Sequence, residues 1–299
     1  MRALVTGATG FVGSRLADAL RGRGDEVRCL VRDAGRSAHL RQRGFDLHEG
    51  DLLRPETLAG AGRDVDVAYY LVHLMGGGGD FAARERQAAS AFARMARQEG
   101  VGRVVYLGGL GDTEGSAHLR SRHATALVLA DEGPPLTYFR AAMVVGARSE
   151  SYRTLRYLVQ RLPVMVTPSW LRTPTQPIGI EDTVAYLAQA PAVEASAGRE
   201  VQIGGPDVLA YADMLDRMAR ALDKRPPLKV PVPLLSPALS SLWLGLVTPV
   251  DTGVARPLIE GLRTPTVVTD GAGAALFDVR AQPFDVTLRQ ALAEERDER

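Results

Sequence analysis

The fold of this chain is constrained most by a glycine-rich segment near its start, Thr6-Gly7-Ala8-Thr9-Gly10-Phe11-Val12-Gly13. The segment follows an apolar run, Ala3-Leu4-Val5, and opens a stretch with a helical pattern. A strand that ends in glycines three residues apart can turn sharply and bring bare backbone close to a pyrophosphate, with the N–H groups of the next helix directed at the negative charge. Gly7 would allow the turn, Gly10 would leave room for the phosphates, and Gly13 would let the helix pack closely on the strand. The order of strand, glycines and helix favours a dinucleotide-binding unit over a chance glycine-rich turn.

Residues 26–33 predict a second strand, whose carboxyl end should lie beside the adenosine ribose of the dinucleotide. A carboxylate at this place accepts hydrogen bonds from a free 2'-hydroxyl, whereas an arginine pairs with a 2'-phosphate. Arg32 stands there with Arg36 close behind, which favours NADP(H) over NAD(H). If the strand ends one residue later, Asp33 reaches the ribose and NAD(H) is favoured instead. Arg32 is also compatible with an ordinary solvated arginine at a strand end.

Short apolar runs alternate with helical patterns over the first half of the chain, which is typical of a parallel sheet covered on both faces. The clearest helix is expected at 81–98, and a second at 119–130. The strands are expected at 3–6, 27–31, 46–49, 65–72, 104–107 and 137–139. The sequence therefore predicts an α/β fold with a doubly wound parallel sheet.

Asp51 follows the third expected strand, within Gly50-Asp51-Leu52. Its carboxylate could accept a hydrogen bond from the adenine amino group of the dinucleotide. It could equally cap a helix that begins near Pro55. The sequence leaves these two roles open.

The second half of the chain changes character from Gly146 onward, where prolines become frequent. Residues 162–177 predict loop or edge structure rather than regular strand–helix units. A short strand leading into a helix is expected at 178–186, a further strand at 199–203 and a helix at 211–222. No internal repeat or low-complexity tract interrupts this order.

Composition and charge agree with a soluble enzyme-sized chain. The 299 residues are 45% hydrophobic, enough for a substantial core. Its 36 basic and 35 acidic residues leave a formal net charge of +1, so no bulk attraction to nucleic acid or to a membrane surface is expected. The single cysteine, Cys29, can build neither a disulfide framework nor a thiol metal cluster, and a reducing cytoplasmic location suits it. We expect no metal site, no signal peptide and no nucleic-acid partner.

Residues 234–250 are rich in leucine and contain Trp243. Pro233, Pro237 and Pro249 cut this segment below the roughly 20 apolar residues that span a bilayer, so no membrane span is expected. The segment predicts a buried helix. An interfacial or dimer-forming helix is the alternative, because Trp243 and the leucines could form an exposed apolar face.

The chain resembles the extended or atypical short-chain dehydrogenases/reductases, and within them the NmrA-like NAD(P)H-binding proteins. The resemblance rests on the glycine segment and on motifs spread in the family's order over nearly the whole chain: Leu30-Val31-Arg32-Asp33, Gly50-Asp51-Leu52, Val104-Val105-Tyr106-Leu107, Phe139-Arg140, Gln176-Pro177-Ile178 with Asp182, and Ile203-Gly204-Gly205-Pro206. It implies a Rossmann-type sheet of about seven strands, formed by 1–145 with 176–205 returning to it. It also implies a smaller C-terminal substrate lobe, formed by 146–175 and 206–299, and a homodimer.

The chain departs from this family at the reacting centre. Active members use a serine at the end of the fifth strand, and a tyrosine four residues before a lysine, to hold the carbonyl and move the proton. Here Gly108 or Gly109 holds the serine position, and His118 and Arg122 best match the tyrosine and lysine positions. A histidine can move a proton near neutral pH, although a neighbouring arginine lowers its pKa and cannot itself carry protons.

The alternative for this pair is that His118 is a surface residue at the start of a helix while Arg122 contacts only ribose or solvent. His123 and His73 are other candidates for moving the proton. His73, just past the fourth strand, would lie near the phosphates or the nicotinamide ribose of the cofactor.

Two functions follow from the sequence. The first is an NADP(H)-dependent oxidoreductase acting on a small carbonyl, alkene or quinone-like substrate in a partly apolar cleft, with His118 and Arg122 as catalytic candidates. The second is a non-catalytic NADP(H)-binding redox sensor or assembly factor, as the NmrA-like resemblance allows. A sugar-nucleotide epimerase is disfavoured because it too needs the missing tyrosine and lysine. The residues expected to bind the cofactor are Thr6, Gly7, Thr9, Gly10, Phe11, Val12, Gly13, Arg32, Asp51, Leu52, Leu71 and His73.

Overall fold

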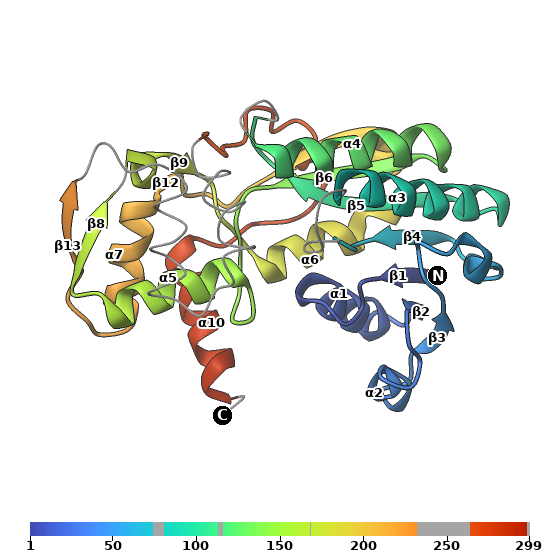
Figure 1. Ribbon diagram of the computed structural model, residues 1–299, viewed down its shortest axis with the longest axis horizontal. Helices are drawn as coiled ribbons and strands as arrows, with labels where there is room; N and C mark the ends of the chain where they lie inside the picture. The colour runs from blue at the N-terminus through green and yellow to red at the C-terminus, as the bar shows by residue number, and fades with distance from the viewer. Residues whose placement is uncertain (74–80, 113–115, 168, 232–263, 298–299) are drawn as a thin grey trace.

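The fold is seen in a computed structural model, which describes residues 1–73, 81–112, 116–167, 169–231 and 264–297 (Figure 1). Its centre is a seven-stranded sheet in which every pair of neighbours is parallel. From one edge to the other the strands are β11 (Arg199–Ile203), β6 (Leu136–Ala141), β5 (Arg103–Gly109), β4 (Val67–Tyr70), β1 (Arg2–Thr6), β2 (Glu26–Val31) and β3 (Asp46–Glu49). The chain order reverses between β1 and β4, so the expected Rossmann-type doubly wound sheet is confirmed.

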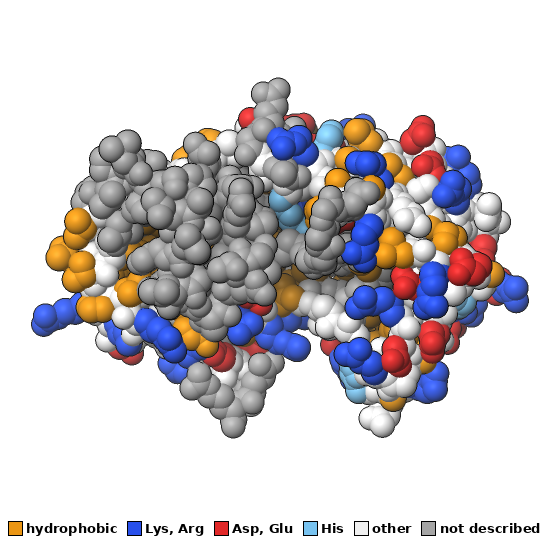
Figure 2. All heavy atoms as spheres, in the orientation of Figure 1, with side chains coloured by type: hydrophobic (Ala, Val, Ile, Leu, Met, Phe, Trp, Pro, Cys, Tyr) orange, Lys and Arg blue, Asp and Glu red, His pale blue; other side chains and the backbone are white. Residues whose placement is uncertain are grey.

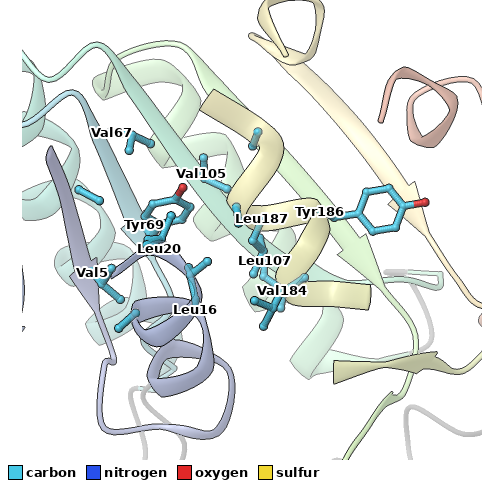
Figure 3. Packing of buried hydrophobic residues seen from close by; sticks show 14 of the residues in the cluster. Val5, Leu16, Leu20, Val67, Tyr69, Val105, Leu107, Val184, Tyr186 and Leu187 are labelled. Carbon is cyan, nitrogen blue, oxygen red and sulfur yellow. The ribbon is translucent and has the colours of Figure 1, made fainter. Parts of the chain in front are cut away.

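Helices cover both faces of this sheet, because strands such as β4 are buried along their whole length and have no polar face to turn to water. One face carries α1 (Phe11–Gly22) and α6 (Ile180–Gln189), and the other carries α3 (Phe81–Gln98) and α4 (Ala117–Glu132). A short helix, α2 (Ala38–Gln42), joins β2 to β3. Figure 3 shows the first face, where Leu16 and Leu20 of α1 and Val184 and Leu187 of α6 pack towards Val5, Tyr69 and Leu107.

A second hydrophobic cluster lies away from the sheet and joins three helices. These are α5 (Glu150–Arg161), α7 (Tyr211–Ala221) and α10 (Phe284–Asp297), which stand together at one end of the molecule (Figure 1). Three short strand pairs border them: β7 (Val144–Val145) with β10 (Ile178–Gly179), β9 (Pro174–Thr175) with β12 (Leu209–Ala210), and β8 (Val164–Thr167) with β13 (Leu228–Pro231). Single 3-10 turns occur at Pro55–Leu58, Ser169–Arg172, Ala190–Ala192, Glu194–Ser196 and Ala274–Leu276.

The last helix connects this cluster to the first helix of the sheet. Glu294 of α10 pairs with Arg15 of α1, and Glu295 accepts a hydrogen bond from the Tyr152 hydroxyl of α5 at 3.2 Å. Arg156 of α5 also pairs with Glu295. The N-terminal helix and the helices of the second cluster are therefore tied together through α10.

Most expected elements are present, and their ends differ for local reasons. The fourth strand covers four residues rather than 65–72, because the N–H of Leu71 donates to the side chain of Thr6 at 2.9 Å instead of continuing the ladder. The helix expected at 119–130 begins two residues earlier, where the hydroxyl of Ser116 accepts from the N–H of Leu119. The leucine-rich segment 234–250 with Trp243 lies outside the described residues, as does the side chain of Trp170.

No helix in the described part of the chain has the length and apolarity needed to cross a bilayer. Basic and acidic side chains are intermingled on the face shown in Figure 2, over the part of the molecule that holds the sheet. This face therefore presents no large patch of one sign over the sheet.

Candidate functional site

The turn after β1 has a backbone that only glycine allows. Gly7 has φ +68°, and a Cβ added there would lie 2.7 Å from the carbonyl oxygen of Leu71. A Cβ at Gly13 would lie 2.2 Å from the carbonyl oxygen of Gly7, so the helix rests directly on the turn. The Thr6 hydroxyl holds the neighbouring strand in place, since it donates to Tyr69 O at 3.0 Å and accepts from Leu71 N. The turn thus exposes backbone with no side chain over it.

The N-terminus of α1 is open to an anion. Its N-cap residue is Gly10, which has no side chain to cap the helix, and Thr9 and Gly10 are exposed. The N–H groups of Phe11, Val12 and Gly13 stand in the first turn, where an α-helix supplies no acceptor of its own. Their alignment with the helix dipole favours negative charge. A pyrophosphate therefore fits this turn by its charge and by the absence of side chains.

The residues after β2 show which of Arg32 and Asp33 is free to contact the ribose of a dinucleotide. The strand ends at Val31, and Arg32 is the first residue beyond it. Arg32 is exposed and makes no ion pair with any described residue. The Asp33 carboxylate accepts from the N–H of Arg36 at 2.9 Å and so holds the following turn, while Glu49 accepts from Ala34 N at 3.1 Å. The carboxylates of Asp33 and Glu49 are thus engaged by the turn, whereas the guanidinium of Arg32 is not.

Asp51 does not cap a helix, so that alternative is wrong. The turn at Pro55–Leu58 has Arg54 as its N-cap residue and no side-chain cap. One oxygen of Asp51 accepts from Leu53 N at 3.0 Å, and the other lies 3.6 Å from the guanidinium of Arg54. The side chain of Leu52 is buried. The adenine role of Asp51 stays a prediction.

The end of β5 carries glycines where the resembled family has a serine. A Cβ at Gly109 would lie 2.4 Å from Cδ2 of Leu119, and one at Gly108 would lie 2.6 Å from the ring of Tyr138. A side chain at either position would therefore require a neighbouring side chain to shift.

Four polar side chains form one chain of hydrogen bonds near the carboxyl ends of strands β4 and β5. Nδ1 of His73 lies 2.5 Å from Oε1 of Glu85, and Nε2 of His73 lies 3.2 Å from Nδ1 of His118. The hydroxyl of Ser121 donates to the other oxygen of Glu85. His73 follows β4, Glu85 belongs to α3, and His118 and Ser121 belong to α4. Three separate elements thus build one cluster.

The cluster joins two buried side chains, Glu85 and Ser121, to two half-buried histidines, and it carries one negative charge. Burial, together with the charges of Arg122 and His73, lowers the pKa of His118 to about 3, against the opposing charge of Glu85. Burial also lowers the pKa of His73, against the opposing effect of Glu85. Burial acts to raise the pKa of Glu85, but the hydrogen bonds from His73 and Ser121 and the charge of Arg122 outweigh it, so that this pKa is lowered. At neutral pH both imidazoles are neutral and Glu85 is ionised.

Arg122 lies beside the cluster as a fixed positive charge. Its Nη2 donates to the carbonyl oxygen of Leu107 at 2.6 Å, and its Nε is buried with no partner among the described residues. Its carbonyl oxygen accepts from the Tyr106 hydroxyl at 3.2 Å. His123 stands apart, with its ring centroid 6.4 Å from that of Tyr138. The structure thus joins His118 and His73, and it leaves His123 outside the chain of hydrogen bonds.

Glu85 and Ser121 were not identified from the sequence. A signal for Glu85 exists, since it falls on the buried stripe of α3 with Ala88, Ala89 and Phe92, where an unpaired acid would be costly. An acid on an apolar stripe indicates a buried partner on a neighbouring element. No group of three or more metal-ligating side chains is found among the described residues.

Comparison with known proteins finds a family match over part of the chain. Residues 7–142 match the NAD(P)H-binding family. Photosystem II assembly factor Ycf39 of Cyanophora paradoxa is 43% identical over 58 residues, which is 19% of this chain and 18% of that protein. The matched stretch is therefore short in both chains.

Solved structures share the fold over nearly the whole chain. Citrobacter sp. triphenylmethane reductase superposes with a TM-score of 0.77 at 17% identity, covering 98% of this chain and 100% of that chain. The NADPH-dependent quinone oxidoreductase QOR2 of Escherichia coli superposes with a TM-score of 0.75 at 17% identity, covering 99% and 100%. At such identity these likenesses show the fold alone.

The predicted cofactor is confirmed at the level of the nicotinamide dinucleotides. The Rossmann-type sheet is shared with epimerase- and reductase-like proteins. Residues 7–142 of the chain thus match the NAD(P)H-binding family, and the chain shares its fold with solved epimerase and reductase structures.

Proposed function

We propose that this protein is an NADP(H)-dependent oxidoreductase that acts on a small carbonyl, alkene or quinone-like substrate through a non-standard reacting centre. One observation carries the proposal. The turn after β1 and the cluster of His73, Glu85 and His118 lie at the same end of the sheet, where the strands have their carboxyl ends. The cluster comes from the residues that follow β4 and from helices α3 and α4. Ligands of open α/β sheets bind at this edge, beside the reversal of strand order.

The cofactor would be held by backbone and by one arginine. The first-turn N–H groups of α1 would bind the pyrophosphate, and Arg32 would pair with a 2'-phosphate. The two fold neighbours support this choice, since triphenylmethane reductase is known as a complex with NADP(H) and QOR2 as a complex with NADPH. The remaining cofactor candidates, Asp51, Leu71 and His73, border the same edge and complete the proposed site.

The bound dinucleotide supplies a carrier of hydride, and the chain supplies charge and a proton path. Arg122 places positive charge where negative charge develops on a substrate oxygen during reduction. His118 is the ionisable group that could exchange a proton with the substrate, in place of the missing tyrosine. Gly109 leaves the carbonyl without the serine that usually holds it.

Binding and turnover should be measured separately. NADPH and NADH are titrated by cofactor fluorescence, and NADPH consumption is then followed with a panel of a quinone, an enone and a simple ketone. The proposal expects tight NADPH binding and turnover of at least one acceptor, with turnover but not binding lost in His118→Ala. NADPH binding without turnover of any acceptor would contradict it.

A second candidate is an NADP(H)-binding redox sensor or assembly protein without turnover. Gly109 favours it, because no serine stands where the resembled family holds the substrate carbonyl. The short likeness to a photosystem II assembly factor points in the same direction. The sensor reading expects cofactor-dependent binding of a protein partner, whereas the oxidoreductase needs none.

A further inference from the structure

The hydrogen bonds among Glu85, His73 and His118 determine which imidazole nitrogens carry protons. Glu85 is an ionised carboxylate and can only accept hydrogen bonds, so Nδ1 of His73 must carry the proton that joins them. Nε2 of the neutral His73 is then an acceptor, and the proton between the two rings belongs to Nδ1 of His118. It follows that Nε2 of the neutral His118 carries a lone pair and no proton.

This outer nitrogen is the open end of the chain of hydrogen bonds. Nε2 of His118 has no hydrogen-bond partner within the described part of the protein, and the His118 side chain is half-buried rather than sealed. His118 stands in the first turn of α4, just beyond the carboxyl end of β5, while His73 follows β4. Leu71, two residues before His73, contacts the glycine turn. The lone pair is therefore placed beside the proposed cofactor site.

We infer that Ser121, Glu85 and His73 act through His118 as one proton relay, and that the resting relay accepts a proton from a substrate hydroxyl whose carbon gives up hydride. The inference rests on the proposed oxidoreductase function and names its substrate class: a secondary alcohol, paired with the corresponding ketone. His118 is the catalytic residue of this relay, and Glu85 and His73 are positioning residues.

The step balances in atoms and electrons. The C–H bond of the alcohol breaks and its electron pair leaves with the hydrogen as hydride to the oxidised nicotinamide. The O–H bond breaks and its electron pair becomes the second bond of the carbonyl. The proton passes to Nε2 of His118, the Nδ1 proton of His118 shifts to His73, and that of His73 shifts to Glu85, from which it returns to solvent through the same chain. In the direction of reduction, a proton loaded on the relay moves back to the oxygen.

Charges on every neighbouring element bear on this transfer. Arg122 of α4 opposes a second positive charge at His118, and Glu85 of α3 offsets it. Tyr106 of β5 is buried nearby, and its pKa is raised by burial. Among the described residues, Glu85 is the carboxylate whose charge acts on His118, so moving the proton along the relay ends on the group that carries the compensating charge. Loss of this carboxylate should leave the structure largely intact and change the chemistry.

Nitrogen NMR of the protein without cofactor tests the assignment directly. Long-range ¹H–¹⁵N spectra separate protonated from unprotonated imidazole nitrogens. The relay predicts that His73 is protonated at Nδ1 and that His118 is protonated at Nδ1 and unprotonated at Nε2 between pH 6 and 8. A protonated Nε2 on neutral His118 would overturn it, whatever the activity of the protein.

Kinetics of alcohol oxidation supply the second readout, with NADP+ and the probe cyclohexanol. In Glu85→Gln the amide can either donate to or accept from Nδ1 of His73, so the tautomer of His73 is no longer fixed. The substitution also removes the carboxylate that takes up the proton. We expect kcat to fall at least about tenfold while the KM for NADP+ stays within about twofold. A positioned general base typically raises the rate by roughly 10²–10⁴-fold. His118→Ala should lose more, and added imidazole should restore part of its kcat.

Glu99→Gln is the matched control. Glu99 follows the same helix as Glu85 and accepts from the N–H groups of Gly60 and Gly62, away from the relay. It should lower thermal stability and leave kcat and its pH profile unchanged. Unchanged kcat in Glu85→Gln would overturn the relay alone. Absence of turnover by the wild-type protein with cyclohexanol and with the acceptor panel would overturn the proposed function and the relay's role as a base together.

Discussion

The carbonyl oxygen of Leu71 occupies the space that a side chain on Gly7 would need, since the two positions are 2.7 Å apart. The residue that follows strand β4 therefore closes the back of the turn after β1. The proposed cofactor site depends on this contact between Gly7 and Leu71, which are 64 residues apart in the chain by the difference of their numbers.

Gly7→Ala is expected to weaken NADPH binding at least about tenfold, because the variant combines a positive φ with contact against backbone that cannot move aside. The unfolding free energy should fall by about 1–3 kcal/mol. Fluorescence titration and thermal denaturation measure the two effects. Gly24→Ala is the control, since Gly24 has φ +87° with open space around it, and should cost stability without affecting binding.

Arg32→Ala is expected to weaken NADPH binding by roughly 10- to 100-fold and to leave NADH binding unchanged, because a lost charge-assisted pair costs about 1.5–3 kcal/mol. Titration of both cofactors with wild type and variant measures the change in selectivity. Arg86→Ala, which removes an exposed arginine of α3, serves as the charge control. Equal losses of NADPH and NADH binding in Arg32→Ala would place the guanidinium elsewhere than at the 2'-phosphate.

Thr6→Val should lower the unfolding free energy by about 1–3 kcal/mol, because it removes the hydroxyl that accepts from Leu71 N and leaves a buried donor unpaired. NADPH affinity should fall as well, since Leu71 supports the turn at Gly7. Thr6→Ser keeps the hydroxyl and should retain most of both. Chemical denaturation and titration compare the two variants, and similar behaviour of valine and serine would argue against the role of the hydroxyl.

Acid should destabilise the protein before its carboxylates titrate. The folded pKa of His118, about 3, lies below its ordinary value of 6.5, so the unfolded chain takes up a proton as pH falls below about 6.5 and the folded protein does not. The stability linked to this group is therefore full above pH 6.5 and is lost towards pH 3, with a slope of up to about 1.4 kcal/mol per pH unit. His73 adds in the same direction.

Urea denaturation between pH 6.5 and 5 measures this slope, in a window above the ordinary range of Glu85. His118→Gln should remove the contribution of His118 and make the unfolding free energy depend less steeply on pH. His39→Gln, at an exposed position of α2, is the control and should keep the wild-type slope. An unchanged slope in His118→Gln would show that the ring titrates normally in the folded protein.

The sheet could be predicted from the sequence because its signals are local. The glycines after β1, the alternation of apolar runs with helical patterns and the helix at 81–98 each follow from neighbouring residues. Strand ends were less accurate where a side chain from another strand takes the backbone hydrogen bond, as Thr6 does for Leu71.

The buried cluster could be predicted only in part. His73 and His118 were each singled out, but their contact joins residues 45 apart in the chain, and nothing in the local pattern places one beside the other. Glu85 gave a signal by lying on an apolar stripe, yet its partners come from two other elements. The sequence could not decide whether Asp51 caps a helix or contacts adenine, because the geometry of the turn decides between these roles. The structure excludes the helix cap.

The central claim is that the turn after β1 holds a nicotinamide dinucleotide and that Arg32 selects the phosphorylated form. Isothermal titration of the purified protein with NADPH and with NADH tests it most directly. The account predicts a saturable heat with one equivalent of NADPH per chain and affinity for NADH weaker by roughly 10-fold or more. Absence of heat with both cofactors would contradict it.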